Sequence, residues 1–351
     1  MKFCTRHPPL AWDAKCYLLE PRNNNCRMST FLVTGGAGFI GSHLSERLIE
    51  LGHRVIVIDD LSSGSLENLA HLPRGPRLEF VAADAGDPAV LAEWMPNADA
   101  VFHLAATVGV FNIIARPVAT IENNIGTTSR VLEAAARKKT KVVIASTSEV
   151  YGKSGTQSFQ EEGDLVLGAT SKFRWGYAAS KIVDEFLALA FWQEFRLPAV
   201  VVRLFNTIGP RQTGRYGMVV PRFLGQAQRG ENLTVYGDGR QTRCFTHVTD
   251  VVEWLLRLAA DDRAVGGVFN LGNPEEISIL ALAERVIAVT RAAVSIDLIP
   301  YEKAYAAGFE DMQRRVPDIG RVTALTGYGP CVGLDEALCR TWQWLVACGN
   351  P

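Results

Sequence analysis

TFLVTGGAGFIGSHLSERLIEL, residues 30–51, joins a β-branched, apolar run to an amphipathic stretch through a glycine-rich turn. A run of this kind is typical of a strand buried on both sides of a parallel sheet. The glycines permit a tight turn, and a helix N-terminus directly after such a turn attracts phosphate. The segment therefore predicts a dinucleotide-phosphate site, to which we assign Gly35, Gly38, Phe39, Ile40 and Gly41.

A carboxylate at the end of the next predicted strand, 55–59, supports this interpretation. Asp59 is placed to accept hydrogen bonds from both hydroxyls of an adenosine ribose. Residues 60–63 contain no arginine to receive a 2′-phosphate, so NAD is favoured over NADP as the cofactor. Asp84, which follows the predicted strand 78–82, is expected either to contact the adenine amino group or to cap a helix.

Short apolar runs alternate with amphipathic stretches from residue 29 onward, which indicates an α/β fold with a Rossmann-type, doubly wound parallel sheet. The predicted strands are 30–34, 55–59, 78–82, 100–104, 141–146 and 199–204, and the predicted helices are 42–51, 122–138, 177–195, 218–229, 250–260 and 279–292. We expect an NAD-binding domain over 28–208 and a smaller C-terminal α/β lobe over 209–351, with some strands crossing between them.

Composition narrows the classes of partner. The 351 residues are 48% hydrophobic, have a net charge of −1 and contain no apolar run of membrane-spanning length, so neither nucleic acid nor a membrane is an expected partner. The seven cysteines have no metal-ligand spacing, so we expect no metal and predict free thiols in the cytoplasm. Residues 1–27 lack a signal-peptide pattern. They are expected to be a disordered extension, or else a misassigned start before Met28.

Tyr177 and Lys181 are spaced i and i+4, which places them side by side on one helical face. They follow the predicted strand 141–146 and the polar residues at its end, and ligands of open α/β sheets bind at the carboxyl ends of strands. A nearby ammonium lowers the pKa of a phenol, so Tyr177 is the candidate general base. Thr147 can hydrogen-bond the same substrate hydroxyl.

Five motifs together resemble the extended short-chain dehydrogenase/reductases that epimerise, dehydrate or decarboxylate nucleotide sugars. They are TGGAGFIG (34–41), HLAA (103–106), STSEVYG (146–152), YAASK (177–181) and RLFNTIGPR (203–211). The resemblance implies that Lys181 also holds the nicotinamide ribose and that Ala105 contacts the cofactor. It further implies a homodimer packed through the helices at Glu122 and Tyr177 as a four-helix bundle.

The second half of the chain resembles the family's segment that binds a nucleotide diphosphate, and the resemblance implies a UDP-linked sugar as the substrate. By this resemblance Arg243 binds the diphosphate, Tyr236 packs on the base and Asn206 contacts the diphosphate. Arg215 is a further candidate clamp, with a solvated surface charge as the alternative. His247 and Asp250 lie at a strand–helix junction without metal-ligand spacing, so we expect them to be structural.

The residues beside Thr147 favour one reaction. Ser148 is a poor acid, which disfavours dehydration, whereas Thr-Ser-Glu and an arginine at Arg174 resemble UDP-glucuronate decarboxylases. Residues 310–319 resemble the same enzymes, with the functional arginine at Arg315 or, one register earlier, Arg314. Glu149 then handles the proton at C5, and Arg315 pairs with the uronate carboxylate. A UDP-hexose or UDP-hexuronate 4-epimerase is the alternative enzyme, and a non-catalytic NAD-sensing module is the alternative of another class.

Overall fold

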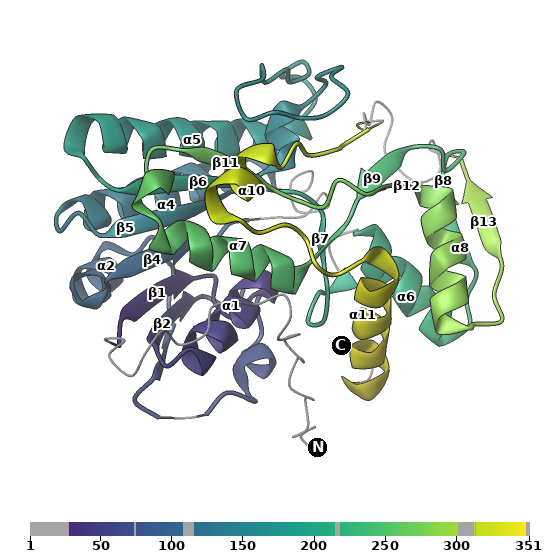
Figure 1. Cartoon of the computed structure of the whole chain (residues 1–351), viewed down its shortest axis with the longest axis horizontal. Coiled ribbons are helices and arrows are strands. Elements are labelled where there is room, and N and C mark those ends of the chain that lie inside the picture. Colours follow the sequence, from purple (N-terminus) through teal and green to yellow (C-terminus); the bar gives the residue numbers. More distant parts are fainter. Residues whose placement is uncertain are drawn as a thin grey trace.

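The computed structural model describes residues 28–73, 75–107, 116–214, 218–300, 312 and 314–348. The extension predicted for residues 1–27 lies outside these ranges. A larger lobe built on a central sheet stands beside a smaller lobe that contains α6, α8 and α11 (Figure 1). Within the described ranges, no helix combines the length and the apolar character that crossing a bilayer requires.

The larger lobe is built on a seven-stranded sheet of order β11-β6-β5-β4-β1-β2-β3, in which every neighbouring pair is parallel. Its strands are β1 (Thr30–Thr34), β2 (Arg54–Asp59), β3 (Leu78–Ala82), β4 (Ala100–His103), β5 (Lys141–Thr147), β6 (Ala199–Leu204) and β11 (Val268–Leu271). The first six were predicted to within one residue at each end, and the doubly wound α/β class is confirmed. β11 was missed because it is short and carries the polar Asn270.

Helices cover both faces of this sheet (Figure 1). Successive strand residues alternate between the faces: Leu32 packs with the helices α2, α4 and α5, and Val33 packs with α1 and α7. These helices are α1 (Phe39–Glu50), α2 (Pro88–Trp94), α4 (Pro117–Ala136), α5 (Trp175–Phe195) and α7 (Val248–Ala260). α4 begins five residues before its predicted start, because a proline is favourable in the first helical turn.

The smaller lobe packs three helices against short two-stranded sheets, with its own apolar core. Its helices are α6 (Val219–Arg229), α8 (Ile279–Thr290) and α11 (Leu334–Cys348). The strand pairs are β8 (Leu233–Tyr236) with β13 (Ile296–Ile299), β9 (Thr242–Cys244) with β12 (Glu276–Ser278), and β7 (Thr207–Ile208) with β10 (Thr246–His247). The remaining elements are α10 (Gly320–Thr326) and the 3-10 helices η1 (Leu66–Leu69), η2 (Met95–Asn97), η3 (Ser148–Tyr151) and η5 (Asp262–Ala264).

The chain passes between the lobes more than once. After α6, β8 and β9 it returns with α7 and β11 to the larger lobe, where β11 pairs with β6 and α7 packs on α1. The strand order of the sheet reverses between β1 and β4, since the chain proceeds from β1 to β2 on one side and through β4 to β5 on the other. Such a reversal opens a crevice at the carboxyl ends of the strands.

A buried ion pair connects α1 to the loop that leads into the smaller lobe. Glu46 Oε2 lies 2.6 Å from Arg211 Nη2, and Glu46 Oε1 lies 3.0 Å from His71 Nε2. Burial opposes ionisation of Glu46, but the hydrogen bond with His71 and the charge of Arg211 outweigh it and lower the pKa of Glu46 to about 2. The ionised carboxylate therefore stabilises the junction of the two lobes.

We predict that Glu46→Gln lowers the free energy of unfolding at pH 7 by about 3 kcal/mol, since a carboxyl pKa depressed to about 2 stabilises the folded state at neutral pH. This stabilisation is fully present above the carboxyl pKa of the unfolded chain and disappears as the pH falls from there towards 2. Urea unfolding of both proteins across this pH range measures the difference. Glu50→Gln is the control on the same helix, because Glu50 pairs with Arg47 near the surface, where such pairs contribute about 0–1 kcal/mol. Equal losses in the two variants would contradict the prediction.

Candidate active site

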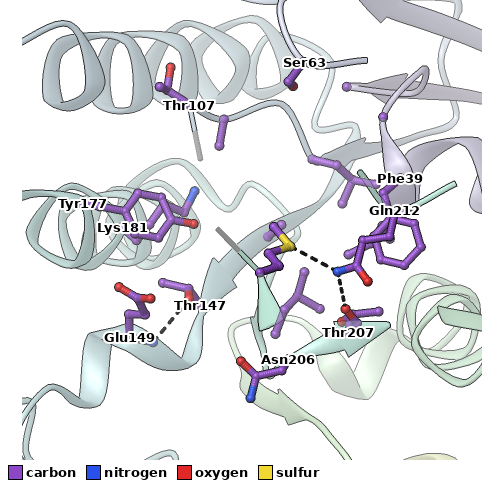
Figure 2. A pocket seen from close by; sticks show the side chains of 18 of the residues that line it. Phe39, Ser63, Thr107, Thr147, Glu149, Tyr177, Lys181, Asn206, Thr207 and Gln212 are labelled. Atoms are coloured by element: carbon purple, nitrogen blue, oxygen red, sulfur yellow. Dashed lines mark hydrogen bonds between the residues drawn. The ribbon is translucent and has the colours of Figure 1, made fainter. Parts of the chain in front are cut away.

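A cavity of about 560 Å³ lies at the carboxyl ends of the strands and is bordered by both lobes. The larger lobe contributes the glycine turn, the ends of β2, β4 and β5, and the first turns of α5. The smaller lobe contributes residues of α6, β8 and β9. Figure 2 shows Tyr177 and Lys181 on the same side of this cavity as Thr147 and Glu149, with Phe39 on another side.

In the glycine turn, the backbone of Gly41 lies close to the backbone of Gly35. Gly35 has φ +69°, and a Cβ on Gly41 would lie 2.2 Å from the Gly35 carbonyl oxygen. Gly38 caps α1 without a side-chain hydrogen bond, so no side chain of the cap occupies the first N–H groups of the helix. Phe39 and Ile40, at the start of α1, also line the cavity. The turn thus has the open helix N-terminus that a pyrophosphate requires.

Asp59 lies at the end of β2 with its carboxylate already held in place. Its Oδ2 accepts a hydrogen bond from the Ala37 N–H at 3.0 Å, and its Oδ1 accepts one from the Leu61 N–H at 2.8 Å. Each oxygen keeps a further lone pair for a ribose hydroxyl. Burial raises the pKa of Asp59 above its usual value, and the two backbone hydrogen bonds oppose that shift.

Asp84 and Ala105 line the same side of the cavity. Asp84 Oδ1 accepts a hydrogen bond from the Gly86 N–H at 2.8 Å. The helix that follows is capped instead by Asp87, whose carboxylate accepts from the Ala89 N–H at 2.8 Å. The expectation that Asp84 caps a helix is therefore wrong, because α2 begins one turn later. Its contact with adenine stays a prediction.

Thr147, Glu149, Tyr177 and Lys181 come together on one wall of the cavity (Figure 2). Thr147 ends β5, and its hydroxyl accepts a hydrogen bond from the Glu149 N–H at 3.2 Å, which starts the single turn of η3. Figure 2 shows Tyr177 on the same side of the cavity as Thr147. The i and i+4 spacing in α5 then places Lys181 next to the phenol.

The electrostatics of Tyr177 differ from the sequence prediction. Burial raises its pKa above the usual value, the charges of Glu149 and Asp184 raise it further, and Thr147 and Arg315 only partly offset this. The prediction that Lys181 lowers the pKa of the phenol is wrong for the protein without ligands. The reason is that the ammonium of Lys181 is paired with the buried carboxylate of Asp184, at 2.8 Å.

Only one of the two neighbouring arginines lines the cavity. Arg315 is nearly buried, and its Nη2 lies 3.6 Å from Glu149 Oε1. Arg314 forms a two-pronged ion pair with Glu276, at 2.8 and 2.7 Å, and is not among the residues that line the cavity. Of the two, Arg315 is the one that lines the cavity, and its role stays a prediction.

The residues predicted to hold a nucleotide also line the cavity, on its smaller-lobe side. Asn206 Nδ2 donates to the Cys244 carbonyl at 3.0 Å, and Arg243 donates to the Thr242 carbonyl at 2.7 Å. Tyr236 and Arg174 are also on the wall. Arg215 lies outside the described residues.

The sequence did not indicate one basic residue that lines the cavity. The guanidinium of Arg222 in α6 stacks on the ring of Tyr236, with 4.0 Å between its Cζ and the ring centroid. Nothing in the local sequence indicates this role, because Arg222 occupies an ordinary polar position of an amphipathic helix. Its place depends on how α6 packs against β8.

His247 and Asp250 have structural roles, as expected. His247 caps α7 by accepting a hydrogen bond from the Thr249 N–H at 3.3 Å. Asp250 is fully buried and accepts from the Tyr328 hydroxyl at 2.6 Å and from two backbone N–H groups. Within the described ranges, no group of three or more acidic, histidine or cysteine side chains could hold a metal ion.

We predict that the protein binds NAD more tightly than NADP, because the Asp59 carboxylate repels a 2′-phosphate. Asp59→Asn should raise the dissociation constant for NAD roughly 10-fold to 100-fold, the usual effect of losing hydrogen bonds to a charged group. The same variant should bind NADP better than the wild type does. Calorimetric titration with both cofactors measures these changes, with Asp87→Asn at the cap of α2 as the control. Equal affinity of the wild type for the two cofactors would exclude this role of Asp59.

Comparisons with known proteins agree with this site. A family model described as "NAD dependent epimerase/dehydratase family" matches residues 31–272. UDP-N-acetyl-alpha-D-glucosaminuronate decarboxylase of Bacillus cytotoxicus is 41% identical over 314 residues, covering 89% of this chain and 96% of that protein. UDP-glucuronic acid decarboxylase 1 of Arabidopsis thaliana is 36% identical over 319 residues, covering 88% and 68%. The structure of UDP-glucuronic acid 4-epimerase from Bacillus cereus, in complex with UDP-glucuronic acid and NAD, has a TM-score of 0.81 at 28% identity, covering 90% and 99%. The chain therefore belongs to the NAD dependent epimerase/dehydratase family and is an NAD-dependent enzyme.

Proposed function

We propose that the protein is an NAD-dependent decarboxylase of a UDP-linked hexuronate. The observation that carries the proposal is the pair Arg315 and Glu149, 3.6 Å apart in the same cavity as Tyr177. A guanidinium at this place can bind the carboxylate of a uronate, and a carboxyl group beside it can handle a proton. The two relatives named above that are at least 36% identical are both uronate decarboxylases by name.

The glycine turn, Asp59 and Lys181 would hold the cofactor. The turn has the free helix N-terminus for the pyrophosphate, and Asp59 has the free lone pairs for the adenosine ribose. Lys181 lines the cavity beside Tyr177 and would bind the second ribose. When bound, NAD takes hydride from C4 of the sugar and later returns it.

Tyr177 would accept the proton of the C4 hydroxyl, with Thr147 hydrogen-bonded to the same oxygen. Both side chains line the same side of the cavity, which supports this assignment (Figure 2). Removing a proton from the C4 hydroxyl and a hydride from C4 itself leaves a 4-keto uronate. The carboxylate carried by C5 is then β to the ketone. Loss of CO2 then leaves an enolate, whose oxygen the same two hydroxyls would stabilise.

Glu149 would deliver the proton that C5 needs after CO2 has left. It lies next to Arg315, which would have held the departing carboxylate, so both act at the same side of the sugar. Protonation at C5, return of hydride to C4 and return of the Tyr177 proton to the C4 oxygen complete the product, a UDP-pentose or its amino-sugar counterpart. Glu149 would take the proton that it delivers to C5 from solvent. Ser148, the first residue of η3, is buried, and a serine hydroxyl is a poor proton donor.

The UDP group would occupy the smaller-lobe side of the cavity. Arg243 would bind the diphosphate, Asn206 would contact it, and Tyr236 would pack on uracil, with Arg174 and Arg215 as further cations. Arg243 is more than nine-tenths buried although it is charged, which fits a residue that binds an anion. The stack of Arg222 on Tyr236 would hold that ring in place.

A 4-epimerase of the same substrates is the second candidate, because the Bacillus cereus neighbour is named as one. The deciding experiment incubates the NAD-loaded enzyme separately with UDP-glucuronate, UDP-N-acetylglucosaminuronate and UDP-glucose, and identifies the products by NMR. We expect release of CO2 from at least one uronate. A C4 epimer formed without CO2 would establish the epimerase instead, and NAD binding without turnover of any substrate would favour a sensing module.

We also propose a homodimer in which α4 and α5 of two copies pack as a four-helix bundle. Large apolar side chains are exposed on both helices of the single chain. They include Val118 and Ile121 on α4, and Val183 and Phe186 on α5. The two helices pack on each other along one side of the larger lobe, so a second copy could cover both at once (Figure 1).

A reducing compartment such as the cytoplasm is our proposal for the location. The four cysteines among the described residues, Cys244, Cys331, Cys339 and Cys348, form no disulfide. Free thiols are typical of proteins in such compartments.

We predict that Glu149→Gln lowers the rate of CO2 release roughly 10²-fold or more, the usual range for losing a general acid or base. Arg315→Ala should raise KM for the uronate roughly 10-fold to 100-fold, because a charged hydrogen bond to the carboxylate is lost. Binding of UDP alone should hardly change. Arg314→Ala is the matched control, since its side chain pairs with Glu276 outside the cavity. Equal effects of the two arginine substitutions would show that Arg315 has no special contact with the uronate.

For the dimer, we predict that Phe186→Asp weakens association roughly 100-fold or more, as expected for a charge placed at an aromatic contact in the centre of an interface. Sedimentation velocity over a range of concentrations measures the effect. Leu298→Asp is the control, because Leu298 is 55% exposed, close to the 68% of Phe186, but lies on β13 in the other lobe. A wild-type protein that stays monomeric at high concentration would rule out the bundle.

A further inference from the structure

Behind the wall that carries Tyr177 and Lys181 lies an ionised group that the mechanism above does not use. Asp184, one turn after Lys181 in α5, has 0% exposed surface, and its Oδ2 accepts a hydrogen bond from Lys181 Nζ at 2.8 Å. It is not among the residues that line the cavity. Its second oxygen, Oδ1, has no hydrogen-bond partner within the described part of the chain.

Burial of this carboxylate needs a reason, because an ionised group with an unused oxygen is costly in the interior. Among the described residues, Lys181 is the cation that pairs with it. Glu185, the neighbouring acid, is occupied by Arg203 on β6, with 2.7 Å between Oε2 and Nη2. Asp184 is therefore paired with Lys181, and the two side chains together carry no net charge.

The other groups around the pair do not change that balance. Burial raises the pKa of Asp184, and Lys181 and the Thr128 hydroxyl on α4 oppose that shift. On β4, His103 hydrogen-bonds Thr128 at 3.1 Å. Burial lowers the pKa of His103 to about 3, so this ring is neutral. On the cavity side, the charges of Glu149 and Arg315 face each other at 3.6 Å. Asp184 thus offsets the positive charge of Lys181, which lies one helical turn from Tyr177.

We propose that Asp184 is a positioning residue that holds the Lys181 ammonium and sets the pH range in which Tyr177 can accept a proton. The proposal rests on the assignment of Tyr177 as the general base. With Asp184 ionised, the phenol has a neutral pair beside it instead of a cation, so phenolate forms only at higher pH. The raised pKa of Tyr177, to which Asp184 contributes, agrees with this.

The test is Asp184→Asn in the NAD-loaded enzyme, which removes the charge and keeps the shape. Ultraviolet difference titration, with Tyr177→Phe as the reference, reports the phenolate of Tyr177 alone. We expect its pKa to fall by about one unit, the usual effect of removing one nearby like charge. The acid limb of the kcat/KM profile should move by the same amount. Asp184→Glu, which keeps the charge, should titrate as the wild type does. An unchanged titration in Asp184→Asn would overturn the proposal.

Two further comparisons separate this result from loss of structure and from the proposed function. Asp250→Asn removes another fully buried carboxylate, which has a structural role and lies far from Lys181 in the sequence. This variant should leave the pKa of Tyr177 unchanged. If Asp184→Asn does not fold, Lys181→Gln is compared with Lys181→Gln combined with Asp184→Asn, and the second should again titrate at lower pH. A shift in the pKa of Tyr177 without turnover of any uronate would contradict the proposed decarboxylase function and still support the role of Asp184.

Discussion

The close approach of the first turn of α1 to the end of β1 is the constraint on which the rest of the structure depends. A single added carbon on Gly41 would lie 2.2 Å from the Gly35 carbonyl oxygen, so the approach is possible only with glycine. It leaves the first N–H groups of α1 uncovered by any capping side chain and directed to the reversal of strand order between β1 and β4. Because all seven strands are parallel, their carboxyl ends then bring Asp59, Thr147 and the start of the smaller lobe to the same place.

Buried charges connect the parts around this place, and each is compensated by a partner. Glu46 and Arg211 join α1 to the loop before the smaller lobe, and Glu185 and Arg203 join α5 to β6. Ion pairs of this kind add little net stability over apolar packing, but breaking one leaves an uncompensated charge. They therefore hold the relative positions of the elements that border the cavity. Lys181 and Asp184 form a buried ion pair of the same kind, but beside the proposed reacting groups. There the neutralised charge also affects the proposed proton transfer to Tyr177.

Charged groups surround the phenol in the cavity. The charges of Glu149 and Asp184 raise the pKa of Tyr177, and Arg315 lies 3.6 Å from Glu149. A uronate carboxylate would compete with Glu149 for Arg315. The substrate would thereby change the charge around the phenol as well as supply the group that leaves.

Local sequence determined the first six strands of the large sheet, six of the helices, the glycine turn, Asp59 and the spacing of Tyr177 with Lys181, because each depends on residues close together in the chain. It also limited the candidate uronate-binding arginine to Arg314 or Arg315. Only the tertiary structure shows that Arg315 lines the cavity and Arg314 does not, since this depends on Glu276 and Glu149, which lie far away in sequence. The same holds for β11, whose pairing with β6 outweighs its polar residue, and for Arg222 on Tyr236. The pKa of Tyr177 could not be predicted from neighbouring residues in the sequence, because a pKa depends on burial and on every nearby charge in the folded protein. Asp184 is buried as a partner of Lys181 only because α5 packs into the interior.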